Sequence, residues 1–165
     1  MHTYDYLNLM EEKFIIKILP FLEHYTKKEK VKIVSLFLDY MKIVHHHLLF
    51  QAIVDIVPNS LNEEELKNMM LKLLNVLDMN VLIEPRLKLS HQRAWTGIMG
   101  IITSHIAFHY WIDEKYVQFD IYTCKKFDKK KAINFLKDFW KATEGKVIFI
   151  NREMGKDFEI EKLDF

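Results

Sequence analysis

The sequence predicts an α+β fold: a two-layer sandwich in which an antiparallel β-sheet carries helices on one face, preceded by an N-terminal helical hairpin. From residue 46 onward, runs rich in β-branched and aromatic residues alternate with two amphipathic helical segments, in the order β-α-β-β-β-β-α-β. The connections between neighbouring strands are short, which favours antiparallel pairing. With 165 residues, of which 50% are hydrophobic, the chain has enough apolar material for a sizeable core.

Residues 1–45 are expected to form the helical hairpin, and residues 46–165 the sandwich domain. Apolar residues recur at helical spacing from Val31 to Val44, and Thr26 followed by Glu29 is a capping-box pattern at the start of this segment. An earlier helical run over residues 7–24 contains a proline at position 20, which should kink or end it. Because no residue here carries chemistry, a packing appendage is favoured over a partner-docking or dimerisation element.

The elements of the sandwich are expected from local patterns. Residues 47–57 are rich in β-branched and aromatic residues and end at a Pro-Asn turn, which predicts a strand. Ser60 with Glu63 predicts a capped helix whose apolar positions run from Leu66 to Leu77. Further strands are expected at 80–91, 97–103, 105–111, 116–124 and 146–150, and a second helix around residues 132–140.

The charge and cysteine content exclude several classes of protein. The chain has 24 Lys+Arg against 23 Asp+Glu, so it lacks the overall basic character that favours nucleic-acid binding. No stretch approaches the roughly 18 apolar residues of a membrane span, and the first residues do not resemble a signal peptide. A single cysteine, Cys124, cannot form an internal disulfide and suits a reducing compartment. We therefore expect a cytoplasmic protein with neither nucleic acid nor membrane as partner.

Polar residues able to do chemistry are concentrated between Thr96 and Cys124. Alternation in the strand at 116–124 predicts that Val117, Phe119 and Ile121 face the helices. The opposite face, which points toward solvent, a second protomer or a ligand, carries five residues: Tyr116, Gln118, Asp120, Tyr122 and Cys124. A polar and aromatic face that ends in a thiol is unusual for a bare solvent surface, which normally carries more Lys and Glu.

Histidines are numerous, but their pattern does not predict a metal site. The three consecutive histidines at 45–47 cannot all point the same way in a strand. His105 and His109 have the spacing of a helical zinc pair, but their surroundings predict a strand and the accompanying glutamate is missing. The residues alone leave open whether Cys124 and His109 form a catalytic pair.

One stretch resembles a known family. The run TGIMGIITSHIAFHYWID at 96–113, followed by YVQFDIYTC at 116–124, resembles the small bacterial and archaeal S-adenosylmethionine decarboxylases. Ser-His, His-x-Trp and Asp-x-x-Thr-Cys elements carry the resemblance without a gap in spacing. It extends more loosely from about residue 46 to the end, which is roughly 120 residues, and leaves the hairpin outside.

The resemblance implies a proenzyme that cuts itself between Thr103 and Ser104. The Ser104 hydroxyl would attack the Thr103 carbonyl, and a pyruvoyl group derived from Ser104 would become the cofactor at the start of chain 104–165. Thr96, where the family has a serine, and His109 would assist processing, His109 by removing the α-proton for elimination. Such cleavage needs a hydroxyl held against a strained, polarised peptide bond with a proton acceptor nearby.

The resemblance also implies how the mature protein acts. The pyruvoyl ketone would accept the electrons released when S-adenosylmethionine loses carbon dioxide, a step that supplies spermidine synthesis. Cys124 matches the proton donor of the family, and Asp113 stands where the family has a ribose-binding glutamate. Trp95, as an adenine-stacking residue, and Trp111 are further candidates for substrate binding. Family members usually form homodimers with the active site near the interface.

Departures from the family pattern leave two alternatives open. Thr103 replaces the usual glutamate before the cut, and other changes surround the substrate pocket. The chain could be a pyruvoyl-dependent arginine or ornithine decarboxylase, or an uncleaved, inactive homologue that acts as a binding or regulatory partner. The retention of Thr96, Ser104, His109 and Cys124 in register favours the S-adenosylmethionine decarboxylase.

Overall fold

The computed structural model describes residues 19–41, 44–55, 61–153 and 157–165. The chain divides into two compact units, Met1–Lys42 and Ile43–Phe165. In the first unit a 3-10 turn, η1 (Leu19–Leu22), precedes helix α2 (Lys27–Met41). The helix expected at 7–24 lies mostly outside the described residues. No described helix is long and apolar enough to cross a membrane.

Helix α2 begins with the capping box that its sequence predicts. The Thr26 N–H donates to the Glu29 carboxylate at 2.8 Å, and the Glu29 N–H donates to the Thr26 hydroxyl at 3.4 Å. These bonds satisfy two amide groups that have no partner within the helix. The start of the helix is therefore confirmed.

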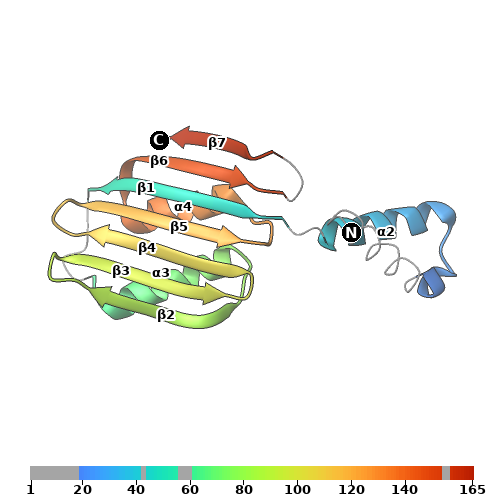
Figure 1. Ribbon diagram of the computed structural model, residues 1–165, viewed down its shortest axis with the longest axis horizontal. Helices are drawn as coiled ribbons and strands as arrows, with labels where there is room; N and C mark the ends of the chain where they lie inside the picture. The colour runs from blue at the N-terminus through green and yellow to red at the C-terminus, as the bar shows by residue number, and fades with distance from the viewer. Residues whose placement is uncertain (1–18, 42–43, 56–60, 154–156) are drawn as a thin grey trace, which may run out of the picture. The chain divides into compact units, whose positions relative to one another are not determined.

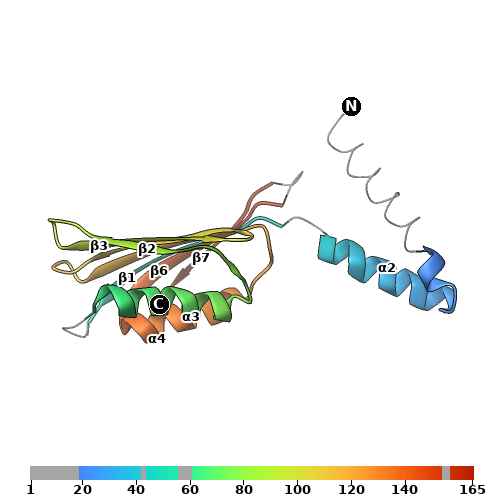
Figure 2. The ribbon, with the colours of Figure 1, turned by 90° about the horizontal axis from the view of Figure 1, so that it is seen from below.

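The second unit is a sandwich of one antiparallel sheet and two helices (Figure 1, Figure 2). Seven strands of the described residues pair in the order β2-β3-β4-β5-β1-β6-β7, and each neighbouring pair is antiparallel. Both helices lie on the same face (Figure 2), which leaves an open face on the other side of the sheet. The elements are β1 (His46–Val54), α3 (Glu63–Val76), β2 (Val81–Leu89), β3 (Ala94–Ile101), β4 (Ser104–Trp111), β5 (Tyr116–Thr123), α4 (Lys129–Trp140), β6 (Ala142–Asn151) and β7 (Glu159–Asp164). The predicted α+β class is confirmed.

The core lies between the sheet and the two helices. On β5, Val117, Phe119 and Ile121 are at most 2% exposed, which confirms the alternation expected for this strand. The Trp140 ring of α4 contacts the rings of Tyr110 and Phe119, with centroid distances of 4.8 and 6.1 Å. Aromatic contacts from one helix therefore tie β4 to β5 and stabilise their pairing.

Some element boundaries differ from those expected. Helix α3 is capped by Asn62 and Glu65 rather than by Ser60 and Glu63: the Glu65 N–H donates to Asn62 Oδ1 at 3.0 Å, and the Asn62 N–H donates to the Glu65 carboxylate at 3.1 Å. Ser60 lies outside the described residues. Strand β3 begins at Ala94, three residues earlier than expected.

Strand β7 was not expected at all. Its six residues are exposed and four of them are charged, so no alternation of buried and polar residues marks it in the sequence. It pairs with β6 from Lys146↔Asp164 to Asn151↔Glu159. Pairing with a neighbour, rather than burial of one face, therefore defines this edge strand.

Gly97 gives a test of this packing. It pairs with Phe108 across β3 and β4, and a methyl group at position 97 would overlap the Phe108 ring. That ring is stacked on Phe119 with centroids 5.2 Å apart, so it has little room to move. We expect Gly97→Ala to lower the free energy of unfolding by about 1–3 kcal/mol in denaturant titration. Glu84→Ala on the exposed edge strand should change the free energy of unfolding by less than about 0.5 kcal/mol. Equal stability of the two variants would contradict the close contact between Gly97 and the Phe108 ring.

Candidate functional site

Ser104 occupies a strained position at the start of β4. It follows the tight turn at 102–103, and its backbone φ is 152°, in a region that residues with a side chain rarely adopt. Such conformations cost on the order of 1–3 kcal/mol and persist only when the surroundings hold them. Here Ser104 is held from both sides, because it pairs with Ile101 on β3 and Thr123 on β5.

The peptide group before Ser104 is fixed by two further contacts. The Thr103 carbonyl accepts a hydrogen bond from the Cys124 N–H at 3.0 Å. The hydroxyl of the buried Thr123 donates to the Thr103 hydroxyl at 2.9 Å. An N–H donor withdraws electron density from a carbonyl and stabilises negative charge that develops on its oxygen. The Cys124 side chain itself is exposed, just past the end of β5.

The Ser104 hydroxyl contacts an imidazole, which in turn lies near a carboxylate. Ser104 Oγ lies 3.2 Å from His105 Nδ1, and His105 Nε2 lies 3.7 Å from Asp120 Oδ1 on the neighbouring strand. The same Asp120 oxygen lies 2.9 Å from Nε2 of His47 on β1. We call the set Ser104, His105, Asp120 and His47 the serine group.

Electrostatics keep the Asp120 carboxylate ionised. The hydrogen bond from His47 lowers the pKa of Asp120 most, and the charges of His47, His105 and Arg152 lower it further. Partial burial acts in the opposite direction but does not outweigh them. At neutral pH the serine group therefore contains a negative charge beside two imidazole rings.

The three consecutive histidines diverge. His45 Nδ1 lies 2.6 Å from the Tyr122 hydroxyl, and His47 contacts Asp120. His46 packs instead against Phe149, with ring centroids 4.8 Å apart. Burial, followed by the charges of two nearby lysines, lowers the pKa of His46. Among the described residues, no three His, Cys, Asp or Glu side chains form a group that could hold a metal ion.

Thr96 and His109 form a second group on the open face. They pair across β3 and β4, and Thr96 Oγ1 lies 3.0 Å from His109 Nδ1. The His109 ring stacks on Trp111, with centroids 5.4 Å apart. Five residue-to-residue steps of extended strand, roughly 17 Å, separate Ser104 from His109. Within one chain the structure thus brings Thr96 to His109, but it does not bring His109 to Ser104.

The remaining candidates lie in different surroundings. Asp113 sits in the turn between β4 and β5, where its Oδ1 accepts a hydrogen bond from Arg93 Nε at 2.9 Å. Burial and, second, the Asp113 charge raise the pKa of Tyr110 to about 12. Trp95 is only 9% exposed and belongs to the core on the helix-covered face. It points away from Thr96, so we leave it out of the ligand-binding proposal below.

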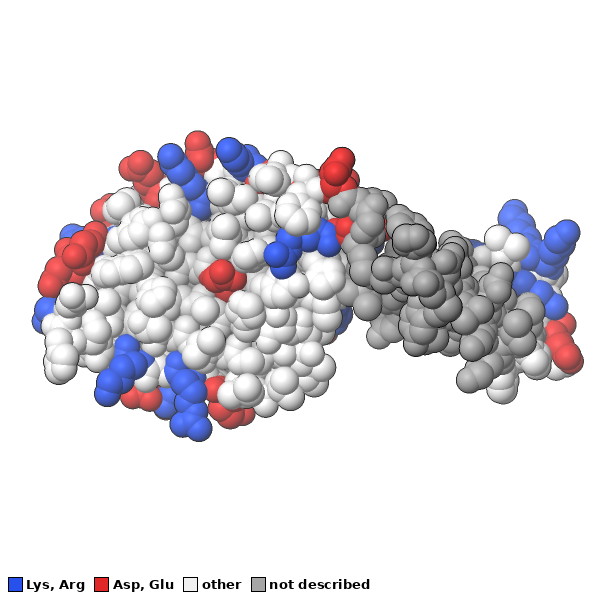
Figure 3. Space-filling view, viewed as in Figure 1, with Lys and Arg blue, Asp and Glu red and all other residues white. Residues whose placement is uncertain are grey.

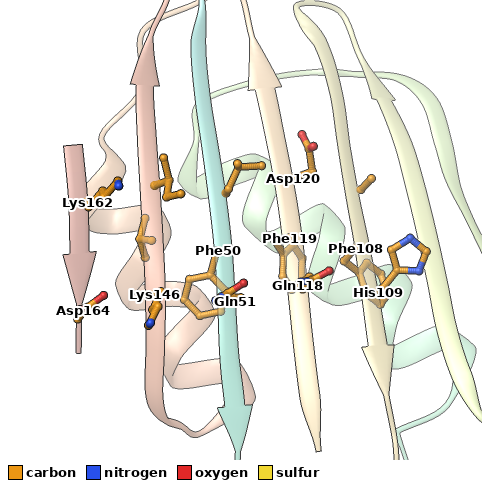
Figure 4. A pocket seen from close by; sticks show the side chains of 14 residues that line it. Phe50, Gln51, Phe108, His109, Gln118, Phe119, Asp120, Lys146, Lys162 and Asp164 are labelled. Carbon is orange, nitrogen blue, oxygen red and sulfur yellow. The ribbon is translucent and has the colours of Figure 1, made fainter. Parts of the chain in front are cut away.

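A groove of about 650 Å³ lies on the open face (Figure 4). It runs across the strands from His109 on β4, past Asp120 on β5 and then β1 and β6, to Lys162 and Asp164 on β7. Its labelled polar side chains are Gln51, Gln118, Lys146, Lys162 and Asp164, together with Asp120 and His109. Figure 3 shows that charged residues gather along the rim of this face and are sparse in its middle.

Three members of the serine group have no role predicted from the sequence. His105 and Asp120 belong to the polar residues between Thr96 and Cys124, and His47 belongs to a run of histidines whose pattern does not predict a metal site. The alternation of side chains along β1 predicts the face of that strand on which His47 lies, and the alternation along β5 does the same for Asp120. That these two strands are neighbours is a long-range property of the fold, which local patterns do not reveal.

Known proteins share both sequence and fold with this chain. Residues 48–153 match the family model for S-adenosylmethionine decarboxylase. The S-adenosylmethionine decarboxylase proenzyme of Clostridium botulinum (strain Loch Maree / Type A3) is 31% identical over 99 residues, which are 59% of this chain and 84% of that protein. The proenzyme of Pyrococcus abyssi (strain GE5 / Orsay) is 34% identical over 65 residues, 39% of this chain and 47% of that protein.

A solved structure has the same fold. The crystal structure of the adenosylmethionine decarboxylase from Aquifex aeolicus VF5 matches with a TM-score of 0.54 and 17% sequence identity. The match covers 70% of this chain and 94% of the other. At this level of identity the likeness concerns the fold alone.

The ionised Asp120 predicts a pH-dependent contribution to stability. Because its pKa is lowered in the folded chain, the carboxylate stabilises the fold above its ordinary pKa of about 3.9, and this contribution is lost as pH falls through the lowered value. We expect Asp120→Asn to melt at a lower temperature than the unaltered chain at neutral pH. The difference should shrink as pH falls from about 5 to about 2. Asp138→Asn, exposed on α4, controls for the loss of one negative charge. A difference that does not vary with pH would contradict this assignment.

Proposed function

We propose that this chain, which belongs to the S-adenosylmethionine decarboxylase family, is a pyruvoyl-dependent enzyme that cuts itself between Thr103 and Ser104 and then decarboxylates S-adenosylmethionine. The family match spans the cut and extends past Cys124. The product, S-adenosylmethioninamine, would supply aminopropyl groups for spermidine synthesis. We place the catalytic machinery in residues 46–165 and none of it in the N-terminal helices.

The conformation around the Thr103–Ser104 peptide bond is the observation that carries this proposal. Three conditions for self-cleavage occur together there: a strained φ of 152° at Ser104, an N–H donor 3.0 Å from the Thr103 carbonyl oxygen, and an imidazole 3.2 Å from the Ser104 hydroxyl. Cleavage releases the strain, and the donor stabilises charge on the carbonyl oxygen. These residues fit the formation of a pyruvoyl group at position 104.

The proposed cleavage balances without an oxidant. Ser104 Oγ attacks the Thr103 carbonyl carbon, the peptide C–N bond breaks, and the hydroxyl proton passes to the nitrogen, which leaves an ester. Removal of the α-proton of residue 104 then expels the Thr103 carboxylate and leaves dehydroalanine. This takes up one water and releases one ammonia, so chains 1–103 and 104–165 result, the second beginning with the pyruvoyl group.

In the mature enzyme, the pyruvoyl group supplies a ketone that accepts the electrons released with carbon dioxide. The chain's own residues bind substrate and move protons beside it. We assign Cys124 as the donor that returns a proton to the substrate α-carbon, because its exposed thiol adjoins the residue pair at the cut. We assign Asp113 to the ribose hydroxyls, and Trp111, beside His109 and Tyr116, as an aromatic contact for the substrate.

Cys124→Ala separates cleavage from decarboxylation. The backbone N–H at position 124 is retained in this variant, so we expect self-cleavage to continue. Loss of the thiol should lower carbon dioxide release from carboxyl-labelled S-adenosylmethionine by about 10²–10⁴-fold. Arginine and ornithine, assayed in parallel, should release none. Unimpaired turnover would remove Cys124 from this role, and release from arginine or ornithine alone would overturn the proposed substrate.

We further propose that the enzyme is a homodimer joined through the open face of the sheet. The role proposed for His109 requires it to reach residue 104, which lies roughly 17 Å away in the same chain. A two-fold axis that crosses the strands midway would bring the partner subunit's His109 to Ser104. This face also exposes large apolar side chains, Ile53, Ile98 and Ile160, at 41%, 53% and 58%.

Mixed dimers test this arrangement. Ser104→Ala removes the cleavage serine but keeps His109, and His109→Ala does the reverse, so each variant alone should remain uncut. After co-expression, the Ser104→Ala subunit supplies His109 to its partner, and we expect the tagged His109→Ala chain to be cut. Purification through two different tags confirms that mixed dimers form. Mixed dimers that stay uncut would contradict the shared site.

A further inference from the structure

We propose that His105 is the base that takes the hydroxyl proton of Ser104 in the first step of self-cleavage, and that Asp120 and His47 position it. This inference rests on the self-cleavage proposed above. It assigns a catalytic role to a residue next to the cut in the same chain. His109 keeps the later step, removal of the α-proton.

The contact between Ser104 and His105 is not one that a regular strand provides. Neighbouring side chains in a strand point to opposite faces, so adjacent residues do not normally meet. The unusual φ at Ser104 departs from strand geometry, and Ser104 Oγ lies 3.2 Å from His105 Nδ1. Among the described residues, the His105 ring is the side chain within hydrogen-bond distance of this hydroxyl. A base within such reach is the geometric requirement for activating a hydroxyl.

Asp120 sets which nitrogen of His105 carries the proton. Its carboxylate lies 3.7 Å from His105 Nε2, an ion-pair distance longer than a hydrogen bond. The negative charge favours a proton on Nε2, which leaves the lone pair of Nδ1 directed to the Ser104 hydroxyl. The order hydroxyl, imidazole, carboxylate is the one that activates serine in many hydrolases, with the two ring nitrogens exchanged.

His47 fixes Asp120 in turn. Its Nε2 lies 2.9 Å from Asp120 Oδ1, the oxygen that faces His105. The three residues stand on β1, β5 and β4, whose pairing in the sheet is continuous. Asp120 and His47 touch no reacting atom, so they are positioning residues, whereas His105 is catalytic.

The proton returns to the chain within the step. As the bond from Ser104 Oγ to the Thr103 carbonyl carbon forms, the hydroxyl proton moves to His105 Nδ1. As the peptide C–N bond breaks, the imidazolium gives that proton to the nitrogen of residue 104. The ester remains, His105 is neutral again, and no co-reactant is consumed.

Hydroxylamine separates the two steps, because it cleaves esters far faster than peptide bonds. His109→Ala, blocked at the later step, should accumulate the ester, and hydroxylamine should split this chain at residue 104. His105→Ala should form ester at a rate lower by roughly 10²-fold or more, so hydroxylamine should leave it whole. Added imidazole should restore cleavage of His105→Ala. Ester formation at the rate of the unaltered chain would overturn the inference, as would a lack of rescue by imidazole in a variant that retains its melting temperature.

Further variants test the positioning role of Asp120 and control for loss of folding. Asp120→Asn should slow ester formation, and Asp120→Glu should recover part of the rate. Equal rates in these two variants and the unaltered chain would remove Asp120 from the proposal.

If His105→Ala melts below the assay temperature, His105→Asn takes its place with the same expectation. Co-expression with Ser104→Ala should not rescue His105→Ala, because His105 acts within its own chain; rescue would contradict this. Failure of the unaltered chain to cleave refutes the proposed function, whereas normal cleavage of a folded His105 variant refutes only this inference.

Discussion

The hydrogen bond from the Cys124 N–H to the Thr103 carbonyl is the contact on which the candidate site depends. It closes the end of a pairing between β4 and β5 that runs from Ser104↔Thr123 to Trp111↔Tyr116. A slip of one residue would turn His105 to the core face and break the contact with Asp120. The Trp140 ring, packed against aromatic residues of both strands, resists such a slip, so a helix on the far face helps to hold the chemistry of the open face.

The same regular pairing divides the candidate residues into two groups along β4. Ser104 with His105 lies at one end, and His109 with Thr96 lies roughly 17 Å away. A strand cannot bend back to join its own ends. The proposed action of both groups on one peptide bond is therefore the reason why we propose a homodimer. The sparse charge in the middle of the open face agrees with a surface that is covered in a dimer (Figure 3).

Local patterns predicted the α+β class, the buried face of β5 and the apolar face of α3, because periodicity is set by which residues a sheet or helix must bury. They failed where pairing with a neighbouring strand, rather than burial of one face, determines that a segment forms a strand, as in the charged edge strand β7. They also chose Ser60 over Asn62 as the helix cap, since both patterns fit and only geometry separates them. The contact of His47 with Asp120 and the distance from Ser104 to His109 depend on strand order and extension, which a motif read along the chain does not contain.

We propose above that strain and polarisation at the Thr103–Ser104 peptide bond lead to its cleavage. The intact mass of the purified full chain tests this most directly, with Ser104→Ala as the matched control. We expect two fragments, 1–103 and 104–165, the second lighter by one ammonia than a chain that begins with serine, and a single mass for the variant. A single full-length mass for the unaltered chain that persists on incubation would contradict it.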